Sequence, residues 1–414
     1  MSTAIVIGGG PAGMIASGTL AKEFDKVILI EKNKLLGKKL RITGKGRCNI
    51  TNNTDIEEFI NNVPTNPRFL YSAFYSFTNQ DIIALLNSLG VKTKVERGER
   101  VFPESDSAKE VADALKKYAL SKNVTLINAE VTELFTKDKK ITGVKTTKGD
   151  FSADYVILAT GGCSYPLTGS DGKGYQLAEE HGHSIIPPKP SLIPVVTHEK
   201  WVADLMGLSL KNIGISVINK KGKKIYSDFG EMLFTHFGVS GPVILSASAH
   251  MKNLENESYK ISIDLKPALD FDKLDKRICR DFEQFKNKHI INALDELLPK
   301  ALIPVVIQLS QIPQHKAVNS ITKEERQALL RTIKELTVSV KGFRPIDEAI
   351  ITSGGIKVSQ INPSTMESKI IENLYFAGEI IDVDAYTGGF NLQIAYSTGY
   401  LAAISIIEKS RNGE

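Results

Sequence analysis

The sequence contains few of the residues that stabilise secreted proteins or build thiol redox relays. Its 414 residues include only three cysteines, Cys48, Cys163 and Cys279, which lie far apart in the chain. An odd number of widely spaced cysteines argues against a disulfide framework and suits a reducing compartment. No Cys-x-x-Cys pair occurs, so an electron relay through an adjacent dithiol is excluded. We predict no metal site.

Long apolar runs and a strong charge imbalance are also absent. No stretch approaches 18 uninterrupted apolar residues, so we predict no membrane span. No basic segment precedes the first apolar run, so we predict no signal peptide and a cytoplasmic location. The net charge of +5 is too small to indicate nucleic-acid binding by itself. We predict no DNA partner, and the oligomeric state stays open.

The chain is too long for one compact core, and its composition changes along its length. Glycine-rich α/β sequence gives way near Pro187 and Pro188 to short strands and turns, then to a charged helical stretch. Glycine-rich sequence with an α/β pattern returns near residue 345. We therefore predict a two-part α/β domain at 1–190 and 345–414, an inserted β-rich domain at 191–266 and 333–344, and a helical subdomain at 267–332.

A glycine-rich turn opens the first domain. Residues 8–13 (GGGPAG) fit G-x-G-x-x-G, follow an apolar run, open a helical pattern and precede a strand that ends at Glu31. The first glycine permits the tight turn, the second lets the backbone approach a pyrophosphate, and the third lets helix and strand pack closely. The helix end favours phosphate, and Glu31 is placed to accept hydrogen bonds from ribose hydroxyls. The pattern predicts a Rossmann-like, doubly wound dinucleotide-binding fold.

Two further segments favour FAD over NAD as the dinucleotide. Residues 159–162 (ATGG) follow a buried strand and resemble the second glycine motif of FAD-dependent reductases. Near the C-terminus, the run LYFAGE ends at Glu379 and is followed by GGFN at 388–391, which opens a long helix. We expect the acid to meet the ribityl chain. The helix N-terminus would face the flavin edge where negative charge develops on reduction.

Local signals predict several smaller elements. Ser107 and Glu110 have the spacing of a capping box that would begin a helix. Residues 130–150 alternate in polarity and predict a small β-meander. Strands are expected at 213–218 and 224–226, joined by a lysine-rich hairpin.

Residues 43–52 (TGKGRCNITN) resemble the GRCNxTN signature of the BaiN/YhiN flavoproteins, also called the RdsA-like or aminoacetone-oxidase-like family. The blocks that also match this family are 100–103 (RVFP), 230–242, 352–355, 365–369 and 374–399, in the family's order along the whole chain. The resemblance implies non-covalent FAD, a two-part FAD-binding domain, an inserted β-barrel-like domain and a helical subdomain. Lys45 stands where many relatives have glycine, so its side chain must point away from the pyrophosphate or contact it.

The motifs and the resemblance together give a set of predicted cofactor-binding residues. They are Gly8, Gly10, Pro11, Ala12, Gly13, Glu31, Lys32, Gly46, Arg47, Cys48, Asn49, Val131, Ala159, Thr160, Gly161, Gly378, Glu379, Asp382, Gly388, Gly389, Phe390 and Asn391.

Three side chains are candidates for acid–base chemistry beside a flavin. His236 can titrate near neutral pH, although a core or capping role is open. Cys48 could protonate a carbanion, although a small packed cysteine is commoner. Tyr386 could bind substrate or simply cover the flavin. Arg47 does not release its proton and is expected to contact cofactor.

The predicted activity is FAD-dependent oxidoreduction, with hydride transfer from flavin N5 to an activated C=C bond. No second G-x-G-x-x-G occurs, so NAD(P)H is expected to bind transiently as electron donor. The resemblance implies alternatives: C=C reduction in bile-acid intermediates, uridine C5=C6 reduction in 23S ribosomal RNA, or oxidation of aminoacetone by dioxygen. A non-catalytic redox sensor is a further alternative.

Whether the substrate is a small molecule or an RNA is left open by the sequence. The basic run at 32–47 is either a solvated loop beside the cofactor phosphates or a face for a polyanion. Together with 220–224 and 286–289 it supports the RNA alternative, which predicts salt-sensitive binding.

Overall fold

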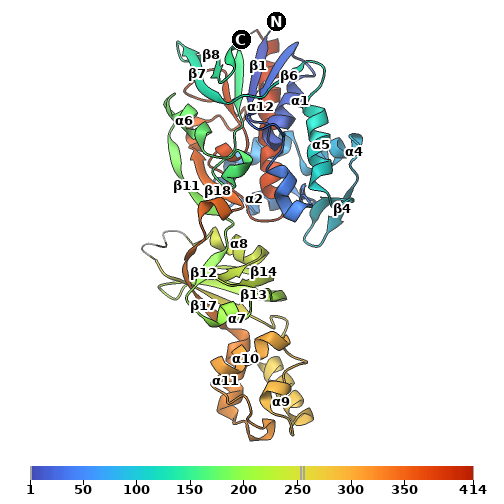
Figure 1. Ribbon diagram of the computed structural model, residues 1–414, viewed down its shortest axis with the longest axis vertical. Helices are drawn as coiled ribbons and strands as arrows, with labels where there is room; N and C mark the ends of the chain where they lie inside the picture. The colour runs from blue at the N-terminus through green and yellow to red at the C-terminus, as the bar shows by residue number, and fades with distance from the viewer. Residues whose placement is uncertain (1, 252–253, 255–256, 414) are drawn as a thin grey trace. The chain divides into compact units, whose positions relative to one another are not determined.

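A computed structural model describes residues 2–251, 254 and 257–413. The chain forms two compact units, which Figure 1 shows as ribbons. The first unit comprises Met1–Ser191 and Pro345–Glu414, and the second comprises Leu192–Arg344. The predicted boundaries of a three-part division stay a prediction.

The first unit is built on a five-stranded parallel sheet with the order β19-β10-β1-β2-β6. The central strands are runs of valine, isoleucine and leucine that are buried on both faces, as a covered parallel sheet requires. This arrangement confirms the Rossmann-like prediction. The strand bounds are β1 Thr3–Ile7, β2 Lys26–Ile30, β6 Val124–Ile127, β10 Tyr155–Leu158 and β19 Leu374–Phe376.

Helices cover this sheet, and α1 packs along the C-terminal helix α12 (Figure 1). The helices of the unit are α1 Pro11–Leu20, α2 Ile56–Asn61, α3 Tyr71–Ser76, α4 Asn79–Ser88, α5 Ala108–Ala119, α6 Lys173–Glu179 and α12 Phe390–Arg411. Three small sheets complete it: β3 Thr51–Asn52 with β4 Thr93–Glu96 and β5 Arg100–Pro103; β7 Val131–Lys137 with β8 Lys140–Thr146 and β9 Gly149–Ser152; and β11 Ile185–Ser191 with β18 Ile351–Ile356. The second of these is the predicted meander.

The predicted capping box at the start of α5 is wrong. Ser107 occupies the N-cap position, but its side chain makes no capping hydrogen bond. The carboxylate of Glu110 instead accepts a hydrogen bond from the Ser105 hydroxyl. A nearer side-chain donor has therefore replaced the N-cap backbone N–H as the partner of Glu110. Complete capping boxes occur at α4, on Thr78, and at α11, on Thr322.

The second unit contains a closed six-stranded barrel with the order β12-β15-β14-β13-β16-β17. Its long hairpin is formed by β13 Ser209–Asn219 and β14 Lys224–Thr235, in the region where two shorter strands were predicted. The remaining strands are β12 Val195–Thr197, β15 Gly238–Ser240, β16 Tyr259–Asp264 and β17 Leu336–Phe343. Alternate residues such as Ile215, Val217 and Ile261 are buried inside the barrel.

Helices join strands of the barrel. The chain between β16 and β17 forms α9 Phe271–Gln284, α10 Ile303–Leu309 and α11 Lys323–Lys334, and shorter helices are α7 Trp201–Asp204 and α8 Pro242–Ser248. Charged residues cover the outer faces of α9 and α11, while Leu274, Ile278 and Leu329 are buried. No helix in the described residues is both long and apolar enough to cross a membrane.

Candidate cofactor site

The glycine turn lies directly at the carboxyl end of β1, in the middle of the parallel sheet. The N–H of Gly8 donates to the Ile30 carbonyl at 2.8 Å, and α1 begins at Pro11 with Gly10 as its N-cap. No side chain caps this helix and no acidic residue occurs in its first turn. The first N–H groups of α1 are therefore free for an anionic ligand, which the helix dipole also favours.

The glycines of this turn have different steric surroundings. A Cβ at Gly8 would lie 2.4 Å from the Ala159 carbonyl oxygen, and one at Gly13 would lie 1.9 Å from the Gly8 carbonyl oxygen. A Cβ at Gly10 would meet nothing within 4 Å. Gly8 and Gly13 thus permit tight packing, whereas Gly10 leaves the space above the helix start that a pyrophosphate needs.

Glu31 is held beside this turn at the end of β2. Its Oε2 accepts a hydrogen bond from the Gly9 N–H at 2.7 Å, and its Oε1 accepts from the backbone and side chain of Asn33 at 2.7 and 2.8 Å. A carboxylate has about four acceptor positions, so one remains for a ribose hydroxyl. The side chain of Lys32 forms an ion pair with Asp171, with 2.8 Å between Nζ and Oδ2.

Glu379 forms the centre of a polar network at the carboxyl end of β19. Its Oε2 accepts from Lys39 Nζ at 2.7 Å, and its Oε1 accepts from the Ser164 hydroxyl at 2.9 Å and the Thr352 N–H at 2.8 Å. Lys39 also donates to the Ser164 hydroxyl at 2.6 Å. Sequence reasoning identified Glu379 but missed its three partners, because they lie in segments separated by more than a hundred residues.

The second helix N-terminus is that of α12. Gly389 is its N-cap, no side chain caps it, and its first turn contains no acidic residue. The side chain of Asn391 fastens the preceding loop: Nδ2 donates to the Ala385 carbonyl at 2.7 Å, and Oδ1 accepts from the Ala385 N–H at 2.9 Å. Asn391 therefore organises the loop before the helix, and a contact between its side chain and cofactor stays a prediction.

The GRCNITN segment packs against this helix start. The Asn52 side chain donates to the Gly388 carbonyl at 3.2 Å, and the Thr51 hydroxyl donates to Gln393 at 2.8 Å. The structure thus brings together two motifs that lie more than 330 residues apart in the sequence. Lys45, at a φ of 57°, and Cys48, at 60°, adopt left-handed backbone conformations in this segment, and the Lys45 side chain is exposed.

Two predicted cofactor residues carry buried oxygens without a partner. Within the described part of the chain, neither Asn49 Oδ1 nor Thr160 Oγ1 has a hydrogen bond. An unpaired buried polar atom costs about 1–3 kcal/mol. A ligand oxygen or nitrogen at this site would supply the missing partner, so the residues fit a bound dinucleotide.

Arg47 forms ion pairs with two carboxylates. Its guanidinium donates to Glu96 at 2.5 Å and to Asp106 at 2.6 Å, and it lies over the Phe102 ring at 4.2 Å. Hydrogen bonds from Arg47 lower the pKa of Glu96, and bonds from Lys94 and Arg47 lower that of Asp106. The predicted contact between Arg47 and the cofactor stays a prediction.

The three predicted acid–base candidates come from both units. Cys48 is fully buried in the core of the first unit, and burial raises the pKa of its thiol to about 12. Tyr386 is half-buried in the same unit, and its N–H donates to the Asn62 carbonyl at 2.9 Å. His236 is exposed in the turn between β14 and β15 of the second unit, with its ring edge against Phe237.

The remaining predicted residues lie along the first unit. Asp382 accepts a hydrogen bond from the Asn66 side chain at 3.0 Å, and Val131 is buried at the start of β7. Among the described residues, no group of three or more His, Cys, Asp or Glu side chains is arranged to hold a metal ion.

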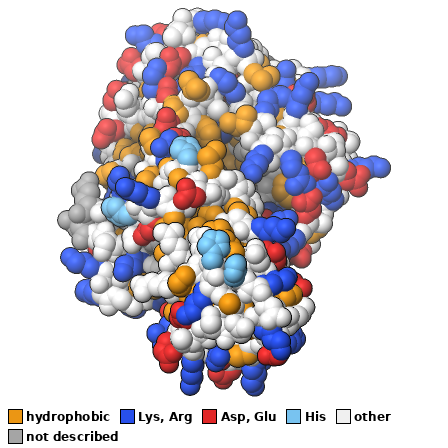
Figure 2. All heavy atoms as spheres, turned by 60° about the horizontal axis from the view of Figure 1, so that its bottom comes forward, with side chains coloured by type: hydrophobic (Ala, Val, Ile, Leu, Met, Phe, Trp, Pro, Cys, Tyr) orange, Lys and Arg blue, Asp and Glu red, His pale blue; other side chains and the backbone are white. Residues whose placement is uncertain are grey.

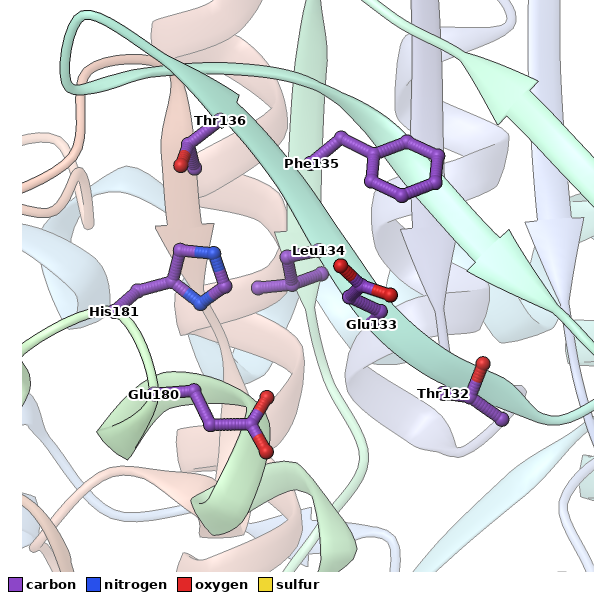
Figure 3. A pocket seen from close by; sticks show the side chains of 7 residues that line it. All are labelled: Thr132, Glu133, Leu134, Phe135, Thr136, Glu180 and His181. Carbon is purple, nitrogen blue, oxygen red and sulfur yellow. The ribbon is translucent and has the colours of Figure 1, made fainter.

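A separate pocket lies beside the β-meander. Its volume is about 530 Å³, and its lining residues are Thr132, Glu133, Leu134, Phe135, Thr136, Glu180 and His181. Figure 3 shows Glu180 and His181 facing the β7 side chains. None of these residues was predicted as a site residue, and His181 Nδ1 already contacts the Leu177 carbonyl at 3.0 Å.

The chain shares its length and fold with known proteins. It is 30% identical over 409 residues to the 3-dehydro-bile acid delta(4,6)-reductase of Clostridium scindens, and the aligned residues cover 98% of each chain. It is 31% identical over 406 residues to the ribosomal RNA dihydrouridine synthase of Escherichia coli, again 98% of each chain. The solved 3-ketosteroid-delta4-(5alpha)-dehydrogenase of Rhodococcus jostii has the same fold, with a TM-score of 0.51 at 13% identity over 98% of this chain and 96% of that chain.

The dinucleotide cradle and these relatives define the class of the protein as an FAD-dependent oxidoreductase. The model of the family described as HI0933-like protein Rossmann domain matches residues 2–405. The chain belongs to this family, and the resemblance predicted from the GRCNxTN signature is confirmed.

Proposed function

We propose that the protein reduces an activated C=C bond with electrons from NAD(P)H. Two observations carry the proposal. No side chain caps the N-terminus of α1 or of α12, and the chain matches relatives named as a reductase and a dihydrouridine synthase over 98% of its length. A delta(4,6)-reductase saturates ring double bonds, and dihydrouridine is uridine with a saturated C5–C6 bond. The shared chemistry of the two relatives is therefore addition of two hydrogens across C=C.

FAD, when bound, supplies hydride transfer at its N5. The chain holds the cofactor in place: α1 would bind the pyrophosphate, Glu31 the ribose, and Glu379 the ribityl chain. The N-terminus of α12 favours negative charge at the flavin edge that faces it. Reduction of C=C also requires a proton at the neighbouring carbon, for which Tyr386, in the same unit as Glu31 and Glu379, is the proposed source. Cys48 is less suited, because its thiol is fully buried and burial raises its pKa.

We propose that the electron donor binds at the same place as the substrate, one after the other. The sequence contains one G-x-G-x-x-G turn, and the structure places it at β1. A donor without its own Rossmann turn binds transiently and leaves before the substrate enters. This order predicts ping-pong kinetics.

An anaerobic spectroscopic titration tests the proposal. NADH or NADPH added to the FAD-loaded protein should bleach the visible flavin absorbance, and a conjugated enone should restore it faster than air does. If neither nucleotide reduces the flavin, but aminoacetone does and air rapidly restores the colour, the protein is an amine oxidase and the proposal is wrong.

A second candidate substrate is a uridine in RNA. The C5=C6 bond of uracil is conjugated with a carbonyl and meets the same chemical requirement. The charge of the second unit favours this candidate: its sequence has 23 Lys and Arg against 17 Asp and Glu, a net charge of +6. The first unit has 29 Lys and Arg against 30 Asp and Glu, a net charge of −1. Figure 2 shows the blue basic side chains on the surface of the molecule.

A further inference from the structure

Six exposed lysines gather at one end of the barrel in the second unit. We call this set the lysine rim; it comprises Lys220, Lys221, Lys223, Lys224, Lys260 and Lys341. Three of them belong to the turn between β13 and β14, and Lys224 is the first residue of β14. The side chain of Asn219 accepts hydrogen bonds from the N–H groups of Lys221 and Lys223 at 3.1 and 3.0 Å, which fixes the shape of the turn.

Strand register places the rim on one outward face. Ile218 pairs with Lys224 on β14 and with Lys260 on β16, while the neighbouring Val217 is buried inside the barrel. Adjacent strands lie about 4.8 Å apart, so the backbones of Lys224 and Lys260 are about 10 Å apart. Lys260 in turn faces Ser339 on β17, two residues from Lys341.

The charges of the rim are not neutralised within the chain. Among the described residues, none of the six lysines forms an ion pair. Of the nearby acids, Glu199 accepts the Ser339 N–H at 2.9 and 3.0 Å, Asp228 accepts the Tyr226 hydroxyl at 2.9 Å, and Glu257 is exposed. The rim is therefore a local excess of positive charge.

A second lysine-rich hairpin, between β7 and β8 in the first unit, provides an internal comparison. It carries Lys137, Lys139 and Lys140, all exposed, but Asp138 lies among them. Lys140 Nζ also pairs with Glu372 Oε1 at 3.0 Å. This hairpin carries exposed lysines as the rim does but lacks the rim's uncompensated charge.

The outward face next to the rim carries small polar side chains and one exposed aromatic ring. Ser216 pairs with Ser227 and Ser262, so small hydroxyl side chains cover the middle of the three strands. Phe229 pairs with Gly214 and is 55% exposed. Lysines near a platform with an exposed ring suit a nucleic-acid strand, whose phosphates need cations and whose bases stack. A membrane-binding surface would need several apolar side chains instead.

We propose that the lysine rim and Phe229 form a binding surface for the backbone and an unstacked base of an RNA. The inference rests on the second candidate substrate and extends it by assigning the contact residues. RNA is the occupant to which the inference commits, because the second candidate substrate is a uridine in RNA.

Fluorescence anisotropy with the FAD-loaded protein and a labelled 30-nucleotide RNA stem-loop with a uridine-rich loop tests the surface. The rim variant replaces Lys220, Lys221, Lys223 and Lys224 with serine, and the control replaces Lys137, Lys139 and Lys140 with serine. We expect the rim variant to bind RNA at least about 30-fold more weakly at 0.1 M KCl. The slope of log affinity against log salt should fall by about 3, at about 0.7 per lost phosphate contact. The control should change affinity less than about twofold.

Phe229→Ala separates stacking from charge. It should weaken RNA binding about tenfold and leave the salt slope unchanged, because a ring contributes no counterion release. Equal losses in the rim variant and the control would overturn the proposal. So would loss of binding to anionic lipid vesicles by the rim variant with unchanged RNA affinity. Reduction of the flavin by NAD(P)H is measured in every variant; its absence in all of them, including the unmodified protein, refutes the proposed function but not the RNA-binding surface.

Discussion

Lysines of the first unit contact carboxylates: Lys32 pairs with Asp171, Lys140 with Glu372 and Lys409 with Glu367, at 2.8 to 3.0 Å. At the lysine rim of the second unit, no described carboxylate takes that role. The first unit thus neutralises these three lysines with its own carboxylates. The second unit contains the uncompensated lysine rim, for which we propose an RNA partner.

The comparison extends to single residues, because glycine and lysine occur in matched settings in both units and cysteine occurs in contrasting ones. A Cβ added at Gly10 or at Gly342 would meet no atom within 4 Å, and neither glycine has a positive φ. Lys39 and Lys316 both form partly buried ion pairs. Cys48 is buried and Cys279 is exposed. If the cofactor site is confined to the first unit, each pair should respond differently to the same substitution.

The largest difference is expected for the glycine pair. Gly10→Val places a branched side chain in the space above the start of α1 and should weaken FAD binding more than about 100-fold, because backbone approach to the pyrophosphate is lost. Titration of the apoprotein with FAD, followed by flavin fluorescence, measures the effect. Gly342→Val should bind FAD normally. Equal FAD affinity of both variants would place the pyrophosphate elsewhere.

A smaller difference is expected for the lysine pair. Lys39 lies 2.7 Å from Glu379, with side chains 20% and 22% exposed; Lys316 lies 2.7 Å from Glu325, at 25% and 22%. Lys39→Met should weaken FAD binding about tenfold, because Glu379 loses the cation that holds it at the site.

The control for this prediction is Lys316→Met. It should cost only about 0.5–1 kcal/mol of folding stability and leave FAD affinity unchanged. Thermal melts with and without FAD separate the two effects. If Lys39→Met lowers the melting temperature equally in both conditions, the role of Lys39 is structural and not directed toward the cofactor.

The smallest difference concerns alkaline stability. Burial raises the pKa of the Cys48 thiol from 9.0 to about 12. The unfolded chain therefore releases this proton at lower pH than the native chain. Its contribution to folding stability is complete below pH 9 and is lost as the pH rises toward 12. The free energy of unfolding should fall by up to about 1.4 kcal/mol per pH unit in this window.

Urea unfolding between pH 8 and 11 measures this slope. Cys48→Ala should flatten it, whereas Cys279→Ala should leave it as in the unmodified protein. An unchanged slope in Cys48→Ala would show that the thiol is accessible to solvent in the native state.

Much of the fold followed from local patterns in the sequence. The strand–turn–helix of residues 3–20, the strand that leads to Glu31 and the long helix after Gly389 all occur where hydrophobic periodicity and glycine placement predicted them. Such signals are readable because a strand, a tight turn and an uncapped helix start each depend on residues close together in the chain. The roles assigned to individual cofactor-binding residues stay predictions.

Contacts between distant segments were not readable in this way. The partners of Glu379 come from residues 39, 164 and 352. Arg47 is held by Glu96 and Asp106, although its motif predicted a cofactor contact. A local contact was missed as well: at the start of α5, Glu110 accepts a hydrogen bond from the Ser105 hydroxyl and not from the expected N-cap N–H. Each outcome depended on which donor and acceptor the folded backbone brought within hydrogen-bonding distance.

The sequence by itself determined the class of this protein: a Rossmann-like oxidoreductase for FAD with a β-rich insertion, because glycines and apolar runs act over one or two elements. Only the tertiary structure decided which lysines are neutralised and which remain available. Lys39 and Lys224 look alike in the sequence, and both stand in basic runs. One meets a carboxylate from 340 residues away, and the other stands on an outward strand face with no described counter-charge. Ion pairs form between side chains that folding brings close together, and the order of residues in the sequence does not specify these distances directly.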